Sequence, residues 1–246
     1  MALPIALQLY TVREETKNDF LATLEKVAEL GYQGVEFAGF GDIDASVMKA
    51  HLDRLGLKAV GSHTAIDLLE NELDDVINYN LTIGNSYITV PYAEYKSKED
   101  FLSMAEKLNE WGNILKEKGL TLCYHNHDQE FEAFDGEYGL DLMYENVDSD
   151  LLKVELDIYW VKKAALDPVD YLSKYSQRTP LVHLKDMDAE TGVFAEVGEG
   201  VIDIQAIIKQ ANKGAAEWLI VEQDICQRPA LESIEISINN LKKMDI

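Results

Sequence analysis

The sequence predicts a single-domain α/β protein whose strands and helices close into a (β/α)8 barrel, the TIM-barrel fold. Three observations support this prediction. Apolar strand-like runs alternate with amphipathic helical segments, eight such units fill 246 residues, and no linker or low-complexity tract separates them. Strands that alternate with helices pair in parallel, and a barrel of eight units commonly needs about 250 residues. We therefore expect one barrel domain over residues 1–246.

The eight expected strands are short runs of apolar and β-branched residues. They are Ile5–Leu9, Gly34–Ala38, Leu57–His63, Ser86–Pro91, Leu120–Cys123, Lys153–Asp157, Pro180–Lys185 and Trp218–Gln223. An open doubly wound sheet is the alternative, and it usually carries a glycine-rich phosphate turn after the first strand. The segment Leu9-Tyr10-Thr11-Val12-Arg13 has no glycine, which favours the closed barrel.

The helices are indicated by apolar residues at helical spacing and by their end signals. Aspartate or serine stands at many of the expected starts, and glycine follows several of the expected ends. The expected helices cover residues 19–30, 44–55, 68–81, 97–118, 139–146, 168–175, 203–212 and 229–243. Two loops are expected, over residues 131–136 and over the glycine-containing stretch 192–200, which we place over the barrel mouth.

Composition restricts the partners and the compartment. The formal net charge is −23, so the surface repels phosphate backbones and nucleic acid is not expected as a partner. No apolar run approaches the roughly 18 residues of a membrane helix, and the N-terminus lacks a secretory signal pattern. Cys123 and Cys226 lie in or beside strand patterns and are expected to be reduced thiols. These features predict a soluble cytoplasmic protein.

Polar side chains that suit a metal site or acid–base chemistry stand at the carboxyl ends of the expected strands. They are Gln8, Glu36, His63, the stretch from His125 to Glu130, Asp157, His183, Lys185 and Glu222. In a (β/α)8 barrel these ends meet at one mouth, where the active site lies. Imidazole and carboxylate groups are ligands for divalent metals. We therefore expect one site at the mouth.

Each residue also has a plain structural interpretation. Asp157 suits a helix cap, and a histidine within a strand, such as His183, is often a hydrogen-bonded core residue. Lys185 lies on the same strand face as His183, and a buried ammonium needs a partner. The aromatic side chains Tyr10, Tyr124 and Trp160 stand near strand ends and suit either packing or stacking on a sugar ring.

The motifs together resemble those of the xylose-isomerase-like sugar phosphate isomerase/epimerase superfamily of TIM barrels. The motifs that carry the resemblance are Leu7-Gln8-Leu9-Tyr10-Thr11-Val12-Arg13, Gly31-Tyr32-Gln33-Gly34-Val35-Glu36, Ser62-His63, Tyr124-His125-Asn126-His127 with Glu130-Phe131, Asp157-Ile158-Tyr159-Trp160-Val161, His183-Leu184-Lys185-Asp186-Met187, Glu196-Val197-Gly198-Glu199-Gly200 and Ile220-Val221-Glu222-Gln223-Asp224. They follow the expected order over nearly the whole chain.

The resemblance implies a metal site that takes one ligand from each of four strands. Asp157, His183 and Glu222 match three of the family's four ligands. The fifth strand departs from the pattern, because His125 stands where many members have a glutamate. We expect Glu130 as the fourth ligand, with His125 as the alternative.

The oxygen-rich ligand set favours Mn²⁺, with Mg²⁺, Co²⁺ or Zn²⁺ as alternatives. The expected catalytic residues are His127, Glu130, Lys185 and Glu222. The expected substrate-binding residues are Gln8, Glu36, His63, His125, Trp160 and Lys185.

The implied activity is a sugar isomerase or epimerase that removes a proton next to a keto group and forms an enediolate. The alternative is a lyase or dehydratase that uses the same site on keto-inositol or 3-keto-glycoside substrates. A nuclease is disfavoured because the charge of −23 repels nucleic acid and because five histidines are far fewer than a three-zinc site would need. A non-catalytic sugar-binding barrel is a further alternative. The expected partner is an unphosphorylated sugar or cyclitol, and the sequence is compatible with a homo-oligomer.

Overall fold

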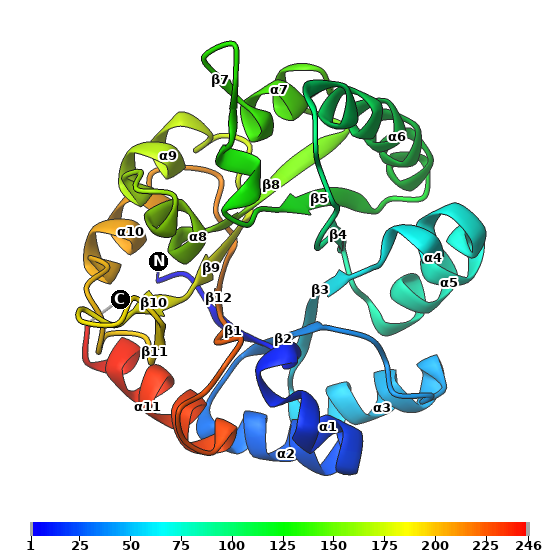
Figure 1. The fold of residues 1–246 in the computed structure, drawn as a ribbon. Coiled ribbons are helices and arrows are strands. Elements are labelled where there is room, and N and C mark those ends of the chain that lie inside the picture. The colour runs from blue at the N-terminus through cyan, green and yellow to red at the C-terminus, as the bar shows by residue number, and fades with distance from the viewer. Residues whose placement is uncertain (1, 245–246) are drawn as a thin grey trace.

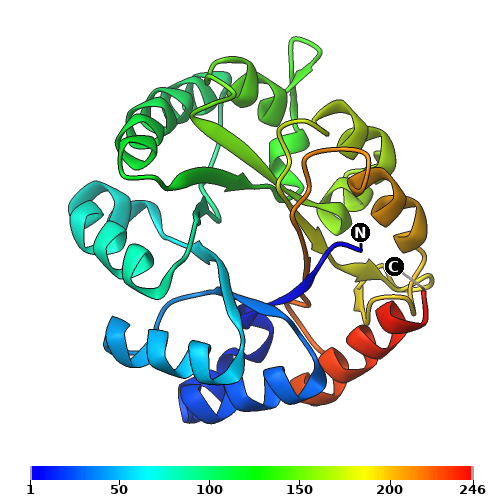
Figure 2. The ribbon, with the colours of Figure 1, turned by 180° about the vertical axis from the view of Figure 1, so that it is seen from behind.

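The computed structural model describes residues 2–244 and confirms the closed barrel. Its eight parallel strands follow the closed order β1-β12-β9-β8-β5-β4-β3-β2, and Figures 1 and 2 show the helices as a ring outside them. The barrel strands are β1 (Ile5–Gln8), β2 (Gly34–Phe37), β3 (Lys58–His63), β4 (Tyr87–Val90), β5 (Thr121–His125), β8 (Leu152–Asp157), β9 (Leu181–Leu184) and β12 (Trp218–Val221). The first and last strands of the chain pair with each other and close the barrel, with Ile5 opposite Leu219.

The helices cover the outside of the barrel, and their end signals act as the sequence predicts. They are α1 (Arg13–Asn18), α2 (Phe20–Leu30), α3 (Ala45–Leu55), α4 (Ile66–Asn71), α5 (Leu73–Ile83), α6 (Lys98–Glu117), α7 (Gly139–Glu145), α8 (Ile158–Lys163), α9 (Pro168–Lys174), α10 (Ile204–Ala211) and α11 (Ala230–Lys243). Ser97 and Asp100 form a reciprocal capping box at the start of α6. Gly31 ends α2 in the left-handed region, at a φ of 96°.

Three parts of the outer layer differ from the predicted elements. A 3₁₀ turn, η1 (Leu9–Val12), and α1 precede α2, and the single helix expected over residues 68–81 is divided into α4 and α5 at Glu72. The φ of Glu72 is −135° and its ψ is 28°, outside the helical region. The helix α8 follows β8 directly, because Asp157 accepts hydrogen bonds from the first free backbone N–H groups of α8.

Short hairpins lie in or beside both expected loops. The 3₁₀ turn η2 (Gln129–Phe131) leads into β6 (Ala133–Phe134), which pairs with β7 (Glu137–Tyr138). The second hairpin pairs β10 (Asp186–Met187) with β11 (Phe194–Ala195). The carboxylate of Asp186 then accepts backbone hydrogen bonds from Gly198, Gly200 and Ile202. This aspartate fixes the glycine-containing segment by local hydrogen bonds.

The barrel interior is apolar at one end and polar at the other. At the apolar end, nearer the amino ends of the strands, a small cluster of buried side chains fills the interior: Ala6, Val60, Tyr87, Cys123, Leu181 and Ile220. Residues two apart on a strand share a face. The residue two positions after several of these apolar side chains therefore also faces the interior, and it is polar. These polar residues are Gln8, Thr89, His125, His183 and Glu222. The strand period therefore places the polar side chains on the inside at the carboxyl ends, where barrel enzymes have their active sites.

No helix among residues 2–244 has the length and apolar character needed to cross a membrane. The two cysteines are free thiols, Cys123 buried inside the barrel and Cys226 partly exposed. The domain boundaries expected at residues 1 and 246 lie outside the described residues.

Candidate active site

Two groups of potential metal ligands lie at the polar end of the barrel, and they share two histidines. We call His63, His125, Glu155 and His183 the lower group, and His125, Asp157, His183 and Glu222 the upper group. Within each group the ligand atoms lie within 4.8 Å of one another. Most of these side chains are fully buried. The structure thus brings together side chains from β3, β5, β8 and β9 and from the residue that follows β12.

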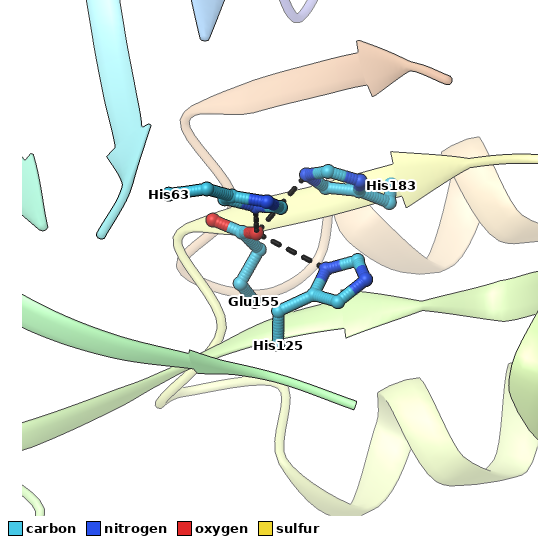
Figure 3. A group of neighbouring side chains, drawn as sticks. All are labelled: His63, His125, Glu155 and His183. Atoms are coloured by element: carbon cyan, nitrogen blue, oxygen red, sulfur yellow. Dashed lines mark hydrogen bonds and ion pairs between the residues drawn. The ribbon is translucent and has the colours of Figure 1, made fainter. Parts of the chain in front are cut away.

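The lower group is arranged around one carboxylate oxygen of Glu155. Figure 3 shows the three histidine rings directed at this oxygen. His63 Nε2 lies 2.6 Å from Glu155 Oε1, and His125 Nδ1 and His183 Nε2 each lie 3.1 Å from it. The second oxygen of Glu155 accepts a hydrogen bond of 2.8 Å from Thr89. This carboxylate is therefore saturated with polar partners inside the barrel.

The carboxylate of Glu36 borders the lower group from β2. Its Oε2 atom lies 2.7 Å from His183 Nε2 and 3.4 Å from His63 Nε2, and Gln8 donates a hydrogen bond of 2.9 Å to the same oxygen. Its other oxygen, Oε1, is buried without a hydrogen-bond partner. Burial, followed by repulsion from Glu155, raises the pKa of Glu36 to about 7. The two buried carboxylates of Glu36 and Glu155 therefore favour a positive charge beside them.

A bulge in β3 gives His63 its place inside the barrel. Val35 pairs with Ala59 but Glu36 pairs with Gly61, so β3 contains one extra residue at this point. A shift of one residue reverses the face to which the following side chains point. A Cβ atom at Gly61 would lie 2.4 Å from Glu36 Oε1, so the glycine also makes room for the carboxylate.

Lys185 contacts two carboxylates of the upper group, Asp157 and Glu222, and the neighbouring Asp224. Its ammonium nitrogen lies 2.9 Å from Asp157 Oδ2, 2.9 Å from Glu222 Oε2 and 2.8 Å from Asp224 Oδ1. Burial opposes the charge of Lys185, but Asp157 and Glu222 outweigh it and hold the pKa of Lys185 well above its usual value. Burial is also the main cause that raises the pKa of Asp157 to about 6. The ammonium is therefore charged and paired with three carboxylates.

The two shared histidines present one ring nitrogen to each group. His183 directs Nε2 toward Glu36 and Glu155 and places Nδ1 2.8 Å from Glu222 Oε2. His125 directs Nδ1 toward Glu155, and its Nε2 lies 3.6 Å from Asp157 Oδ2. A neutral imidazole has one donor and one acceptor nitrogen. When one ring nitrogen of such a histidine binds a metal in one group, the N–H on its other side can therefore be held by a carboxylate of the other group.

A cavity of about 710 Å³ opens above these groups. Its lining includes the predicted site residues His63, His125, His127, Trp160, Lys185 and Glu222. Aromatic side chains of Tyr10, Tyr92 and Phe194 also line it, and such rings pack well on the apolar faces of small cyclic molecules. Burial lowers the pKa of His127 to about 4, and its Nδ1 atom has no hydrogen-bond partner. This histidine is therefore neutral at neutral pH.

Five predicted site residues do not line the cavity: Gln8, Glu36, Glu130, Asp157 and His183. Gln8 and Glu36 are buried beneath it and contact His183 or each other. Glu130, the expected fourth metal ligand, belongs to neither ligand group. Its carboxylate accepts hydrogen bonds from the hydroxyl of Tyr124 at 2.7 Å and from the backbone N–H of His127 at 2.8 Å. The structure places His125, the alternative, beside the other three expected ligands.

Two residues of the site were not singled out by the sequence. Glu155 lies two residues before the expected ligand Asp157 in β8, and Asp224 lies two residues after the expected ligand Glu222 beyond the end of β12. Residues two apart on a strand point to the same face. The alternation of polar Lys153, Glu155 and Asp157 with apolar neighbours is the signal that identifies the inward face of β8. With Glu36, Asp157 and Glu222, these two residues bring the carboxylates near Lys185 and the histidines to five, of which four are buried and Asp224 is partly exposed.

The donor set suits a divalent metal. Three imidazoles and several carboxylates converge at the buried end of the cavity, and Glu36 Oε1 is a buried carboxylate oxygen without a hydrogen-bond partner. Imidazole nitrogen and carboxylate oxygen are the ligand types of Zn²⁺ and of related divalent ions. The residues present therefore fit such an ion.

The sequence model of the family described as xylose isomerase-like TIM barrel matches residues 24–244. Among solved structures, a sugar phosphate isomerase/epimerase from Parabacteroides distasonis superposes with a TM-score of 0.84 at 24% identity, over 98% of this chain and 94% of that chain. The structure of a protein named IOLI, with a binding zinc atom, superposes with a TM-score of 0.78 at 14% identity over 98% of each chain. The family match and the shared fold confirm the resemblance that the motifs indicate.

Curated relatives carry the name of a lyase. The inosose dehydratase of Clostridium beijerinckii is 24% identical over 256 residues, which cover 87% of this chain and 85% of the relative. This relationship supports enzymatic activity. It favours the lyase alternative over the isomerase or epimerase that we expected first.

Proposed function

Because this chain belongs to the xylose isomerase-like TIM barrel family, we propose that it is a metal-dependent lyase that removes water from a keto-inositol or a related polyhydroxylated ketone. The observation that carries the proposal is the position of Lys185 and its three carboxylates at the edge of a cavity, directly above the histidine-rich lower group. The name of the curated relatives, inosose dehydratase, favours elimination as the outcome.

The proposed reaction begins when a base removes the proton on the carbon next to the ketone. His127 is suited to this step, because it lines the cavity, is neutral, and has a ring nitrogen without a partner. The electrons of the broken C–H bond move to the carbonyl oxygen and form an enolate. Lys185 is positioned to stabilise this negative charge, since its buried ammonium keeps its proton.

Elimination then restores the ketone. The new carbon–carbon double bond forms as the C–O bond to the hydroxyl at the β carbon breaks, and the hydroxyl takes a proton and leaves as water. Asp224 lines the cavity, and burial together with the charge of Glu222 raises its pKa. We assign it the transfer of this proton. A bound divalent metal supplies Lewis-acid polarisation of the substrate oxygens.

The substrate class follows from the lining of the cavity. Aromatic rings of Tyr10, Tyr92, Trp160 and Phe194 offer surfaces for a polyhydroxylated ring. Two cations, Arg13 and Lys185, line the cavity among the described residues, and the carboxylates of Glu222 and Asp224 line it beside them. This supports an unphosphorylated ligand. A 3-keto-glycoside is the alternative substrate for the same elimination.

An isomerase or epimerase is the second candidate. It shares the first proton transfer, and it is favoured by the number of acid–base groups around the cavity, since His127 follows β5 and both Glu222 and Asp224 follow β12. Return of the proton to a different carbon or face then replaces the loss of water.

Mass spectrometry of a keto-inositol incubated with the metal-loaded protein in D₂O separates the candidates. The lyase predicts a product that has lost one water. The isomerase or epimerase predicts a product that keeps its composition and gains carbon-bound deuterium. A substrate that neither loses water nor exchanges a proton, across keto-inositols and keto-glycosides, contradicts both candidates. The control is Lys185→Met, which is expected to lower the rate at least about 100-fold because the developing charge loses its partner.

A further inference from the structure

Arg13 lines the cavity, and it differs from the other three arginines in how its charge is matched. Arg54 and Arg228 form ion pairs with glutamates, and Arg178 donates hydrogen bonds to backbone carbonyl groups. Among residues 2–244, no carboxylate oxygen lies within 4.0 Å of a nitrogen of Arg13, in a chain with 45 acidic and 22 basic residues. Because a guanidinium does not lose its proton in proteins, this charge is available to a ligand.

Local contacts hold the guanidinium of Arg13 in place. Its Nη1 atom donates a hydrogen bond of 2.8 Å to the carbonyl oxygen of Tyr10, and its Cζ atom lies 4.3 Å from the centre of the Tyr10 ring. Stacking on an aromatic ring orients the planar guanidinium. The turn η1 is tied to the segment after β12, because the backbone N–H of Gln223 donates to Thr11 Oγ1 at 3.0 Å and both residues are buried. A group that is already oriented loses less entropy when it binds a ligand.

Arg13 also stands apart from the acidic side chains of the cavity. Four charged side chains line the cavity among the described residues: Arg13, Lys185, Glu222 and Asp224. Both carboxylates lie against Lys185, Glu222 at 2.9 Å and Asp224 at 2.8 Å. Within residues 2–244, the Nε and Nη2 groups of Arg13 donate to no protein acceptor. The cavity therefore offers an anion one fixed guanidinium with free donors.

These donors fit a carboxylate. A guanidinium presents parallel N–H groups that pair with both oxygens of a carboxylate. The rings of Tyr92 and Trp160 line the same cavity and suit the apolar faces of a sugar or cyclitol ring. A phosphate monoester carries about −1.5 to −2 charges at neutral pH, and Glu222 and Asp224 in the cavity lining would repel it. One negative charge on a polyhydroxylated ring is therefore the better match for a single arginine.

We infer that Arg13 forms a carboxylate-binding subsite in this cavity, and that the ligand is a polyhydroxylated ring that carries a carboxylate. This inference rests on the proposed function and narrows its substrate to a ring ketone with a carboxylate substituent. Arg13 determines specificity and takes no part in the proton transfers. It is not among the substrate-binding residues that the sequence predicts, although it ends the motif Leu7 to Arg13.

The test is isothermal titration calorimetry with two probes that share one ring, D-glucuronate and D-glucose. We expect the wild type to bind glucuronate at least about tenfold more tightly, because charge-assisted, bidentate hydrogen bonds are the strong ones. Arg13→Met should remove this preference, and Arg13→Lys should keep part of it, since lysine retains the charge but not the fork of donors. The matched control is Arg54→Met, which removes an exposed arginine outside the cavity lining and should keep the full preference.

Each outcome bears on the inference. Equal affinities of the wild type for the two probes, the absence of any binding included, would overturn it, and so would a preference that Arg13→Met leaves unchanged. Tighter binding of the phosphate monoester of glucose than of glucuronate would overturn the choice of a carboxylate.

The salt dependence of the wild type is a second readout, which decides even if Arg13→Met fails to fold, as circular dichroism would detect. The preference for glucuronate should weaken as the ionic strength rises, and a preference that salt leaves unchanged would contradict the inference. Titration needs no turnover, so the two proposals fail separately. A carboxylate preference without elimination from any ketone would support the subsite and contradict the lyase, whereas elimination without that preference would leave the lyase standing alone.

Discussion

Replacement of Lys185 by methionine tests how strongly this ammonium and its three carboxylate partners, Asp157, Glu222 and Asp224, stabilise the barrel mouth. The change keeps most of the side-chain volume but removes an ammonium that lies 2.8 to 2.9 Å from three carboxylates. At an effective dielectric constant of about 20, one pair of unit charges at this separation attracts by about 6 kcal/mol. Desolvation of the ammonium offsets much of this attraction. Removal of one partner of a buried ion pair costs about 3–5 kcal/mol, and we expect that loss in the free energy of unfolding.

The assay is urea unfolding at pH 8 in the presence of a chelator, followed by circular dichroism. The matched control is Lys163→Met, which removes an ammonium 3.0 Å from Asp128 where both side chains are at least 40% exposed. Exposed pairs contribute at most about 1 kcal/mol, so this control is expected to lose little stability. Equal effects of the two substitutions would refute the view that burial makes the Lys185 network strong.

The same variant has a defined pH dependence. The pKa of Asp157 is raised from 3.8 to about 6 by burial, and Lys185 is the first of the charges that lower it. Without Lys185 the folded-state pKa rises further. A raised carboxylate pKa means that the folded state binds the proton more tightly, so the destabilisation is relieved as the pH falls below that pKa. The stability difference from the wild type should therefore shrink between pH 8 and pH 5. A difference that is constant or grows toward pH 5 would contradict this sign.

Three further substitutions test how the barrel supports the site. Gly61→Ala places a methyl group 2.4 Å from Glu36 Oε1, so we expect a loss of about 1–3 kcal/mol by overpacking in urea unfolding and weaker metal binding in chelator competition. Asp141→Ala removes the buried acceptor of the Tyr171 hydroxyl at 2.6 Å, and should cost about 1–3 kcal/mol in the same unfolding assay. Asp186→Ala removes the acceptor of several backbone N–H groups in residues 196–202, and hydrogen exchange in that segment should accelerate at least about tenfold. A variant whose free energy of unfolding, metal binding or hydrogen-exchange rate equals that of the wild type would argue against the contact that its substitution removes.

The sequence predicted the barrel because its signals are local and repeat. Strand periodicity and helix caps such as Asp19 and Asp44 act within a few residues, and the structure confirms both as caps. The break between α4 and α5 at Glu72 was missed, since no glycine or proline stands there and the apolar spacing continues through it. Tertiary packing decides such a break, and a single sequence does not contain that information.

The site was predicted less completely than the fold. Convergence of Asp157, His183 and Glu222 follows from parallel strands that end at one mouth, and the structure brings these residues together. The fourth position could not be predicted, because Glu130 lies in a turn whose direction depends on the hydrogen bond to Tyr124. Glu155 was overlooked for a different reason. Its role depends on three histidines from other strands, one of which reaches the interior through a bulge.

The metal content of the purified protein tests the central claim, that strand ends far apart in the sequence build one metal-dependent catalytic site. The measurement is elemental mass spectrometry on protein prepared without a polyhistidine tag, for the wild type and for His183→Asn. His183 belongs to both ligand groups, so the comparison does not depend on which group holds the ion. The account predicts about one divalent ion per wild-type chain and a loss of most of it in the variant, since a metal site depends on each of its ligands. Wild-type protein without metal after incubation with Mn²⁺ or Zn²⁺, or a variant that keeps the full amount, would contradict it.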